Sequence, residues 1–240
     1  MILQLIFLAF FSTTSLHAED KKILWDSWYT IKVYDNVPFS YYNETVEDRG
    51  EQIHFQQKMW KKEKDSIIEE HIGLLAKNNE ELTPILFNFF RSNGPSSETI
   101  IDGTLNEKNS LHIKMREAAN IKTWNRQLPK ETFLATFFPV WIAKNWAKFK
   151  VGKKMNFKAI VEDSYVTDFP ISPGWVRLEK EDKFSKANKT QKFTVHFRDA
   201  SSYWWVKPSG QMIQMEMPEQ NALVESTTET KAKEFLKNGK

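Results

Sequence analysis

Cysteine is absent from the 240-residue sequence. Its absence excludes disulfide bonds, thiol nucleophiles, zinc–thiolate sites and a lipid-modified cysteine. The motifs of other common enzyme classes are missing as well: there is no Gly-x-Ser-x-Gly elbow, Ser-x-x-Lys pair, phosphate-binding loop, Gly-x-Gly-x-x-Gly or His-Glu-x-x-His. We therefore expect a protein that is not an enzyme and that uses no cofactor or metal.

A large excess of either charge is also lacking. The chain has 34 Lys and Arg against 31 Asp and Glu, a net charge of +3. This balance gives no indication of a nucleic-acid partner. Aromatic residues are abundant by contrast, with nine Trp and eighteen Phe. Because each large aromatic side chain buries ~150–250 Å², the chain can build a sizeable core, and disorder is not expected.

The first residues have the pattern of an export signal. Met1–Phe11 is apolar but shorter than the ~20 residues that span a bilayer, and a short polar segment then ends at Ala18. We expect a signal peptide over residues 1–18 and a single mainly β domain over residues 19–240 in the periplasm or outside the cell. The alternative is an uncleaved anchor or a core strand. No other stretch is apolar enough to span a membrane.

Apolar and polar residues alternate with period two in several stretches, as in strands with one buried face. The clearest are Leu111–Arg116, Met155–Glu162 and Lys192–Arg198. A Pro-Ser-Gly turn between Tyr203–Val206 and Gln211–Met217 predicts a hairpin. The spacing of such segments predicts about ten antiparallel strands, in a curved sheet or half-barrel.

Two segments have helical patterns instead. Residues 131–149 place apolar side chains at spacings of three and four, which predicts a helix packed on the sheet and kinked at Pro139. Ser226–Glu229 matches a capping box before a short C-terminal helix over Thr230–Leu236. The polar segment Glu181–Thr190 is expected to be an exposed loop.

Three segments resemble the β-rich N-terminal region of bacterial transglutaminase-like proteins. Trp28–Tyr34 is similar to its opening strand, Leu128–Lys153 to its central helix with the glycine that follows, and Tyr203–Glu216 to its closing aromatic hairpin. The resemblance covers about residues 25–230. It implies a secreted bacterial protein of unknown function, with a curved sheet shaped like half-barrel lipoprotein carriers and without the catalytic part.

The richness in aromatic residues leads to a hypothesis about function. Trp141, Trp146, Trp175 and Trp205 are our candidates for the lining of a concave sheet that binds a lipid, another apolar small molecule or a partner polypeptide. The alternative is that these side chains only fill the core. The leading hypothesis is therefore a non-enzymatic exported binding protein.

Two other hypotheses remain open. One is an interaction or structural module of the cell envelope, which would bind an envelope protein through exposed edges and loops and hold no small molecule. The other is a hydrolase of unrecognised type. It would need groups such as Glu69 and His71, or His196 and Arg198, which share a strand face, to meet in a cleft.

Overall fold

The computed structural model describes residues 21–33, 37–63, 66–92, 98–162 and 168–237. These residues form one 15-stranded sheet with the order β8-β7-β6-β5-β4-β3-β2-β1-β15-β14-β13-β12-β11-β10-β9. The predicted signal peptide lies outside the described residues. Among the described residues, no helix combines the length and the hydropathy needed to cross a membrane.

The bounds of the elements are as follows. The strands are β1 (Lys22–Val33), β2 (Val37–Arg49), β3 (Gln52–Glu63), β4 (Ser66–Lys77), β5 (Pro84–Ser92), β6 (Glu98–Leu105), β7 (Ser110–Glu117), β8 (Asn120–Gln127), β9 (Thr132–Leu134), β10 (Lys154–Ile160), β11 (Ile171–Leu178), β12 (Gln191–Phe197), β13 (Ala200–Val206), β14 (Met212–Met217) and β15 (Ala222–Thr227). The helices are α1 (Phe138–Lys144), α2 (Lys183–Asn188) and α3 (Glu229–Lys237), with short 3₁₀ turns η1 (Ala135–Phe137), η2 (Trp146–Lys148) and η3 (Pro218–Gln220).

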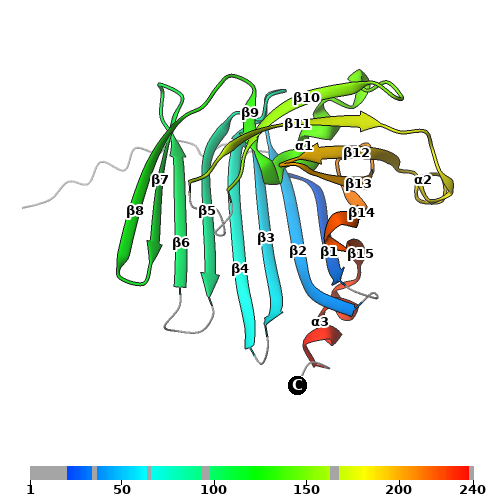
Figure 1. Cartoon of the computed structure of the whole chain (residues 1–240), viewed down its shortest axis with the longest axis horizontal. Helices are drawn as coiled ribbons and strands as arrows, with labels where there is room; N and C mark the ends of the chain where they lie inside the picture. Colours follow the sequence, from blue (N-terminus) through cyan, green and yellow to red (C-terminus); the bar gives the residue numbers. More distant parts are fainter. Residues whose placement is uncertain (1–20, 34–36, 64–65, 93–97, 163–167, 238–240) are drawn as a thin grey trace, which may run out of the picture.

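The sheet consists of two meanders that meet at β1. Strands β1 to β8 follow one another on one side, and β15 back to β10 follow on the other, all antiparallel. The β9–β10 pair is parallel. In Figure 1 the strands β10–β13 run across the upper ends of β2–β5, so the sheet bends over itself, and α1 lies in the bend.

The face of the sheet inside this bend carries most of the core, and we call it the inner face. Val46, Phe55, Leu74 and Phe87 lie in one row across β2–β5 and are almost completely buried. Residues an odd number of positions away along a strand, such as His71 relative to Leu74, lie on the opposite, outer face because side chains alternate. The inner rows of both meanders, together with η1 and α1, form one hydrophobic core.

The prediction of a mainly β fold is confirmed, but about ten strands was too few. The hairpin around residues 207–211 is confirmed as β13 and β14. The C-terminal helix is also present as α3, although its first turn is capped by Thr228, which accepts a hydrogen bond from the Lys231 amide, rather than by Ser226.

The prediction of one kinked helix over residues 131–149 was wrong. Residues 132–134 form the short buried strand β9, η1 follows, and α1 begins only at Phe138. Pro139 therefore occupies the first turn of α1, where a missing N–H breaks no helical hydrogen bond. The expected loop at 181–190 contains α2 instead, whose Asp182 cap accepts a hydrogen bond from the Ser185 amide at 2.7 Å.

Candidate functional site

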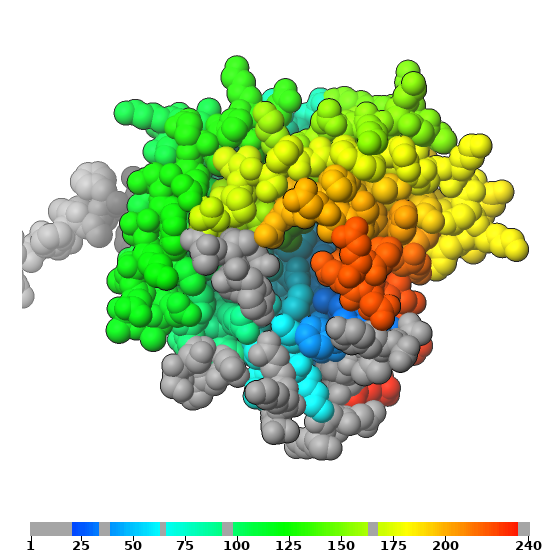
Figure 2. Space-filling model, in the orientation of Figure 1, coloured from blue at the N-terminus to red at the C-terminus, as the bar shows by residue number. Residues whose placement is uncertain are grey.

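An apolar pocket of about 200 Å³ lies on the inner face of the second meander, beneath η1 and α1. Figure 2 shows the molecule hollowed between the orange residues at the start of β13 and the red-orange residues that follow β14, and both regions contribute to the pocket. The lining side chains are mostly aromatic or aliphatic: Phe133, Ala135, Phe138, Phe157, Ala159, Val195, Phe197, Ala200, Trp204, Met215 and Met217. Such a lining favours an apolar ligand.

The aromatic wall of the pocket is one packed group. Phe138 lies 5.0 Å from Phe157 and 5.2 Å from Trp204 between ring centroids, and Phe157 lies 5.6 Å from Phe197. These residues come from α1 and from β10, β12 and β13, which lie close together in the sheet. Contacts between tilted and edge-on rings hold such a wall in a fixed shape.

The polar residues of the pocket are Ser201, Ser202, Glu219 and Gln220. Two of them, Ser202 and Glu219, already accept hydrogen bonds from neighbouring groups. Ser202 Oγ accepts a hydrogen bond from Trp204 Nε1 at 2.8 Å, and Glu219 Oε1 accepts one from the Ser201 amide at 3.3 Å. These bonds fix the Trp204 ring and the end of η3, and they leave the interior of the pocket apolar.

A buried carboxyl group supports the pocket from behind. Glu162 follows β10 and accepts hydrogen bonds from the amides of Ala135 and Thr136 at 2.9 and 2.7 Å. It thereby fixes η1, which brings Ala135 to the pocket wall. Burial raises the pKa of Glu162 to about 7, although hydrogen bonds from Thr136 and Ala135 act in the other direction.

A second apolar cluster continues from the pocket along the inner face. Its buried members are Tyr29, Tyr42, Met212 and Val224, and the pocket residues Trp204, Met215 and Met217 pack against it. Tyr29 donates a hydrogen bond to the Met212 carbonyl at 3.0 Å and stacks on Tyr42 at 4.8 Å.

Glu44 lies in the same part of the inner face. It accepts a hydrogen bond from Trp25 Nε1 at 2.5 Å, and burial raises its pKa to about 7. The two buried carboxyl groups near the pocket, Glu44 and Glu162, are thus both hydrogen-bonded within the protein.

The four tryptophans predicted as ligand-lining residues do not come together. Trp141 packs in the core against Phe133 at 5.5 Å and lines a separate groove of about 550 Å³ rather than the apolar pocket. Trp146 lies against Phe193 at 5.7 Å. The groove beside Trp141 is mixed in charge and is bridged by an ion pair between Lys148 and Glu80.

Trp175 and Trp205 lie on the outer face. Trp175 stacks on His196 at 5.3 Å and lies under the Lys154 ammonium. Trp205 donates a hydrogen bond to Asp182 at 3.1 Å and contacts Phe184 on α2. Neither lines the apolar pocket, so a ligand there would meet other residues, and a binding role for these two remains an untested prediction.

Trp204 and Met217 line the pocket but were not predicted from the sequence as ligand-binding residues. The pairing of Phe193 with Trp204 places Trp204 on the inner face, because Phe193 is buried there. Two adjacent tryptophans in one strand must point to opposite faces. The turn at Arg198 and Asp199 sets this register. Counting outward from it in both directions pairs Phe193 with Trp204 and would have selected Trp204 instead of Trp205.

The pairs considered for hydrolysis lie away from the pocket. His71 and Glu69 form a pair at 2.6 Å on the outer face, with the Phe90 ring beside His71. His196 lies on the outer face beneath Trp175. Within the described residues, no group of His, Asp and Glu side chains has the arrangement of a metal site.

Comparisons with known proteins identify the fold. No family model matches the sequence, and no curated protein does either. Among solved structures, the chain is similar to a β-barrel-like protein of the domain of unknown function DUF1849 from Brucella abortus, with a TM-score of 0.55 and 12% identity over 84% of this chain and 94% of that chain. A DUF1089 family protein from Pseudomonas aeruginosa matches with a TM-score of 0.43 and 7% identity over 75% of this chain and 90% of that chain.

These neighbours correct the predicted resemblance. The fold is shared with the β-barrel-like Brucella protein and not with the N-terminal regions of transglutaminase-like proteins. The segments that carried the resemblance are an aromatic strand, an apolar segment and an aromatic hairpin, which many curved sheets contain. At 12% identity the likeness to the Brucella protein concerns the fold alone.

Proposed function

We propose that the chain is an exported, non-enzymatic binding protein that holds an apolar ligand in the pocket between β10, β12, β13, β14 and α1. The observation that supports this most is the composition of the pocket wall. Five aromatic rings and two methionines surround the space, and the nearby polar residues Ser202 and Glu219 already accept hydrogen bonds within the protein. Burial of apolar surface would supply the binding free energy.

The size of the pocket limits the ligand. An engineered protein cavity of about 150 Å³ binds benzene, so a pocket of about 200 Å³ accommodates one ring system or a short alkyl segment. A longer chain would extend from the pocket along the inner face toward Met215 and Met217, which connect to the second cluster. Flexible methionines adapt to apolar groups of different shape.

The test is a titration with N-phenylnaphthylamine, whose fluorescence rises in apolar surroundings. Its naphthalene ring would occupy the pocket, and its phenyl ring would extend along the inner face toward the second cluster. We expect a Kd of about 10 µM, given the size of the probe, and displacement by octanol or decanoate. The variant Ala200→Trp fills the pocket from β13 and should weaken binding at least tenfold.

Ala187→Trp is the matched control. It makes the same change on the exposed surface of α2 and should leave the affinity unchanged. Equal affinities in both variants, with both folded, would place the probe elsewhere and contradict the proposal.

A further inference from the structure

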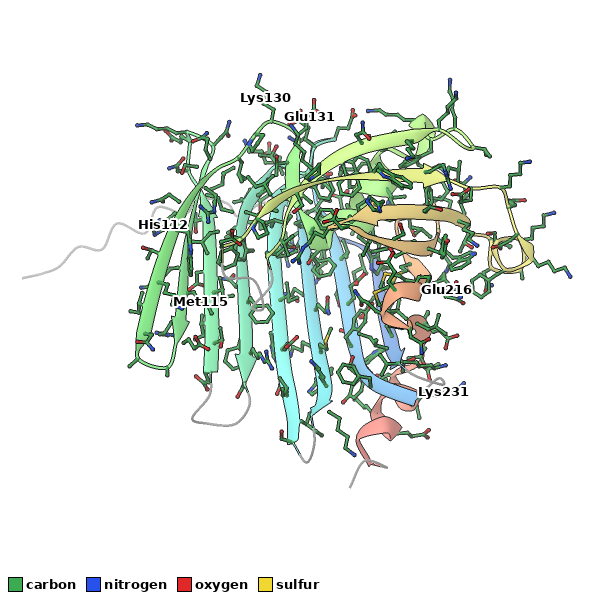
Figure 3. The ribbon with its side chains drawn as sticks, viewed as in Figure 1. His112, Met115, Lys130, Glu131, Glu216 and Lys231 are labelled. Carbon is green, nitrogen blue, oxygen red and sulfur yellow. The ribbon has the colours of Figure 1, made fainter. Side chains whose placement is uncertain are left out.

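The two ends of the sheet differ in their exposure. β9 has three residues, all buried, and lies against β5. β8 has eight residues, most of them exposed, and within the described part of the chain it pairs with β7 alone. In Figure 3, His112 and Met115 lie on β7 at this margin, beside β8. Every second residue of β8 therefore directs its N–H and C=O away from the sheet.

Sheet edges in proteins are usually made unsuitable for pairing by a bulge, a proline, a short strand or a covering segment. β8 pairs with β7 without a register shift over eight residues and contains no proline. Its Ile121 side chain is 58% exposed. The backbone N–H and C=O groups along this edge could therefore form hydrogen bonds with a further strand.

The charged side chains near the β8 edge indicate what kind of strand would bind there. The charged residues of β8 are Lys122 and Arg126, both cationic. On the adjoining outer face of β7, Lys114 and Arg116 are also exposed. Arg126 donates two hydrogen bonds to the carbonyl of Asp168, so an acidic residue lies beside it. Other acidic residues at this margin are Glu117, at the end of β7, and Asp102 on β6, which is the cross-strand partner of Lys114. The cross-strand partners of Lys122 and Arg116 are uncharged, so these two cations are the ones without an acidic residue opposite them.

We propose that the β8 edge binds an extended acidic segment of another protein, which adds to the sheet as a further strand. Backbone hydrogen bonds would provide the affinity, and acidic side chains would meet Lys122 on one face or Arg116 on the other. A second copy of this chain is a poor occupant because it would bring two cationic edges together. This site is separate from the apolar pocket, and neither proposal depends on the other.

The test uses the full chain and a fluorescent ten-residue peptide of alternating Glu and Val. We expect a Kd of about 50 µM at low salt, weakened about tenfold when NaCl rises from 50 to 500 mM because salt screens exposed charges. The matched Lys–Val peptide should bind at least tenfold more weakly. A fully N-methylated Glu–Val peptide, which cannot form a ladder, should not bind.

Two charge-reversal variants locate the site. Arg116→Glu with Lys122→Glu should reduce the affinity for the Glu–Val peptide at least tenfold. Lys183→Glu with Lys186→Glu makes the same change in net charge on exposed residues of α2 and should change it less than twofold. Hydrogen exchange at residues 120–127 should slow when the peptide binds.

Three results would overturn the proposal. They are binding that survives N-methylation, equal loss of affinity in the two charge-reversal variants, and self-association of the wild-type chain through β8 in place of peptide binding.

Discussion

The ring of Phe157 on β10 lies directly over Gly174 on β11. A Cβ atom added to Gly174 would come within 2.4 Å of Phe157 Cζ and 2.8 Å of the His196 carbonyl oxygen. Phe157 is also part of the pocket wall. The missing side chain at Gly174 thus sets the position of a ring on which the proposed ligand would lie.

Gly174→Ala should lower the free energy of unfolding by about 2 kcal/mol, because the new methyl group overpacks a closed site. It should also weaken probe binding, since Phe157 must move. Gly73→Ala on β4 is the control: nothing lies within 4 Å of its added Cβ, and removing a flexible glycine should stabilise the protein by about 0.5 kcal/mol. Urea unfolding of both variants measures the difference, and equal stabilities would contradict the packing described here.

The two buried carboxyl groups predict an unusual dependence of stability on pH. Burial raises the pKa of both Glu44 and Glu162 from 4.5 to about 7. Between these values the folded protein binds more protons than the unfolded chain, so stability falls as the pH rises from about 4.5 to about 7. The loss amounts to about 3 kcal/mol for each group at most.

Substitution of these groups tests the pH prediction. Glu44→Gln with Glu162→Gln should flatten the dependence in this window, as followed by thermal unfolding at several pH values. Glu107→Gln, in an exposed turn, should leave it as in the wild type. Glu47 acts in the other direction below this window: burial alone would raise its pKa, but hydrogen bonds from Lys21 and Arg49 lower it, so its contribution is lost as the pH falls further. A wild-type stability that increases from pH 5 to 7 would contradict the assignment.

The β12–β13 turn should allow stabilisation without loss of the pocket. Arg198 and Asp199 have φ values of 53° and 61°, between the paired residues Phe197 and Ala200. A two-residue turn with two positive φ angles favours Asn-Gly. Arg198→Asn with Asp199→Gly should therefore raise the free energy of unfolding by about 1 kcal/mol. Asp199→Ala should not raise the free energy of unfolding, because alanine, unlike glycine, is disfavoured at positive φ. A gain of about 1 kcal/mol in this variant would refute the explanation.

The adjacent residues Trp204 and Trp205 predict different responses to a bound ligand. Trp204 lines the pocket, whereas Trp205 lies on the outer face beside Asp182. Bromooctane, a heavy-atom quencher that acts at short range, should quench a component of the tryptophan fluorescence. That component should be lost in Trp204→Phe and kept in Trp205→Phe. Loss in Trp205→Phe alone would place the ligand on the outer face.

Much of the sheet could be predicted from alternation, but its extent could not. Stretches such as Leu111–Arg116 have one buried and one exposed face, and the structure shows this pattern in β7. β8 is exposed along nearly its whole length and therefore has little hydrophobic periodicity to detect. β9 is buried on all sides, and a fully buried strand cannot be distinguished from a buried helix by apolar spacing.

The pocket was harder to predict because it depends on register and on the bend of the sheet. Aromatic richness correctly indicated an apolar inner face, yet the sequence alone did not show which tryptophan of the Trp204–Trp205 pair faces it. Trp175 alternates with Val176, which is completely buried, and so lies outside. The contact between Phe138 and Trp204 joins residues that are distant in the sequence, and no local pattern records such a contact.

Native mass spectrometry on the protein from its natural host tests the central claim most directly. We expect the wild-type protein to carry extra mass that disappears on extraction with organic solvent. The same extra mass should be absent from Ala200→Trp and present in Ala187→Trp. Polypeptide mass alone in all three proteins, together with no uptake of N-phenylnaphthylamine, would contradict an apolar ligand in this pocket.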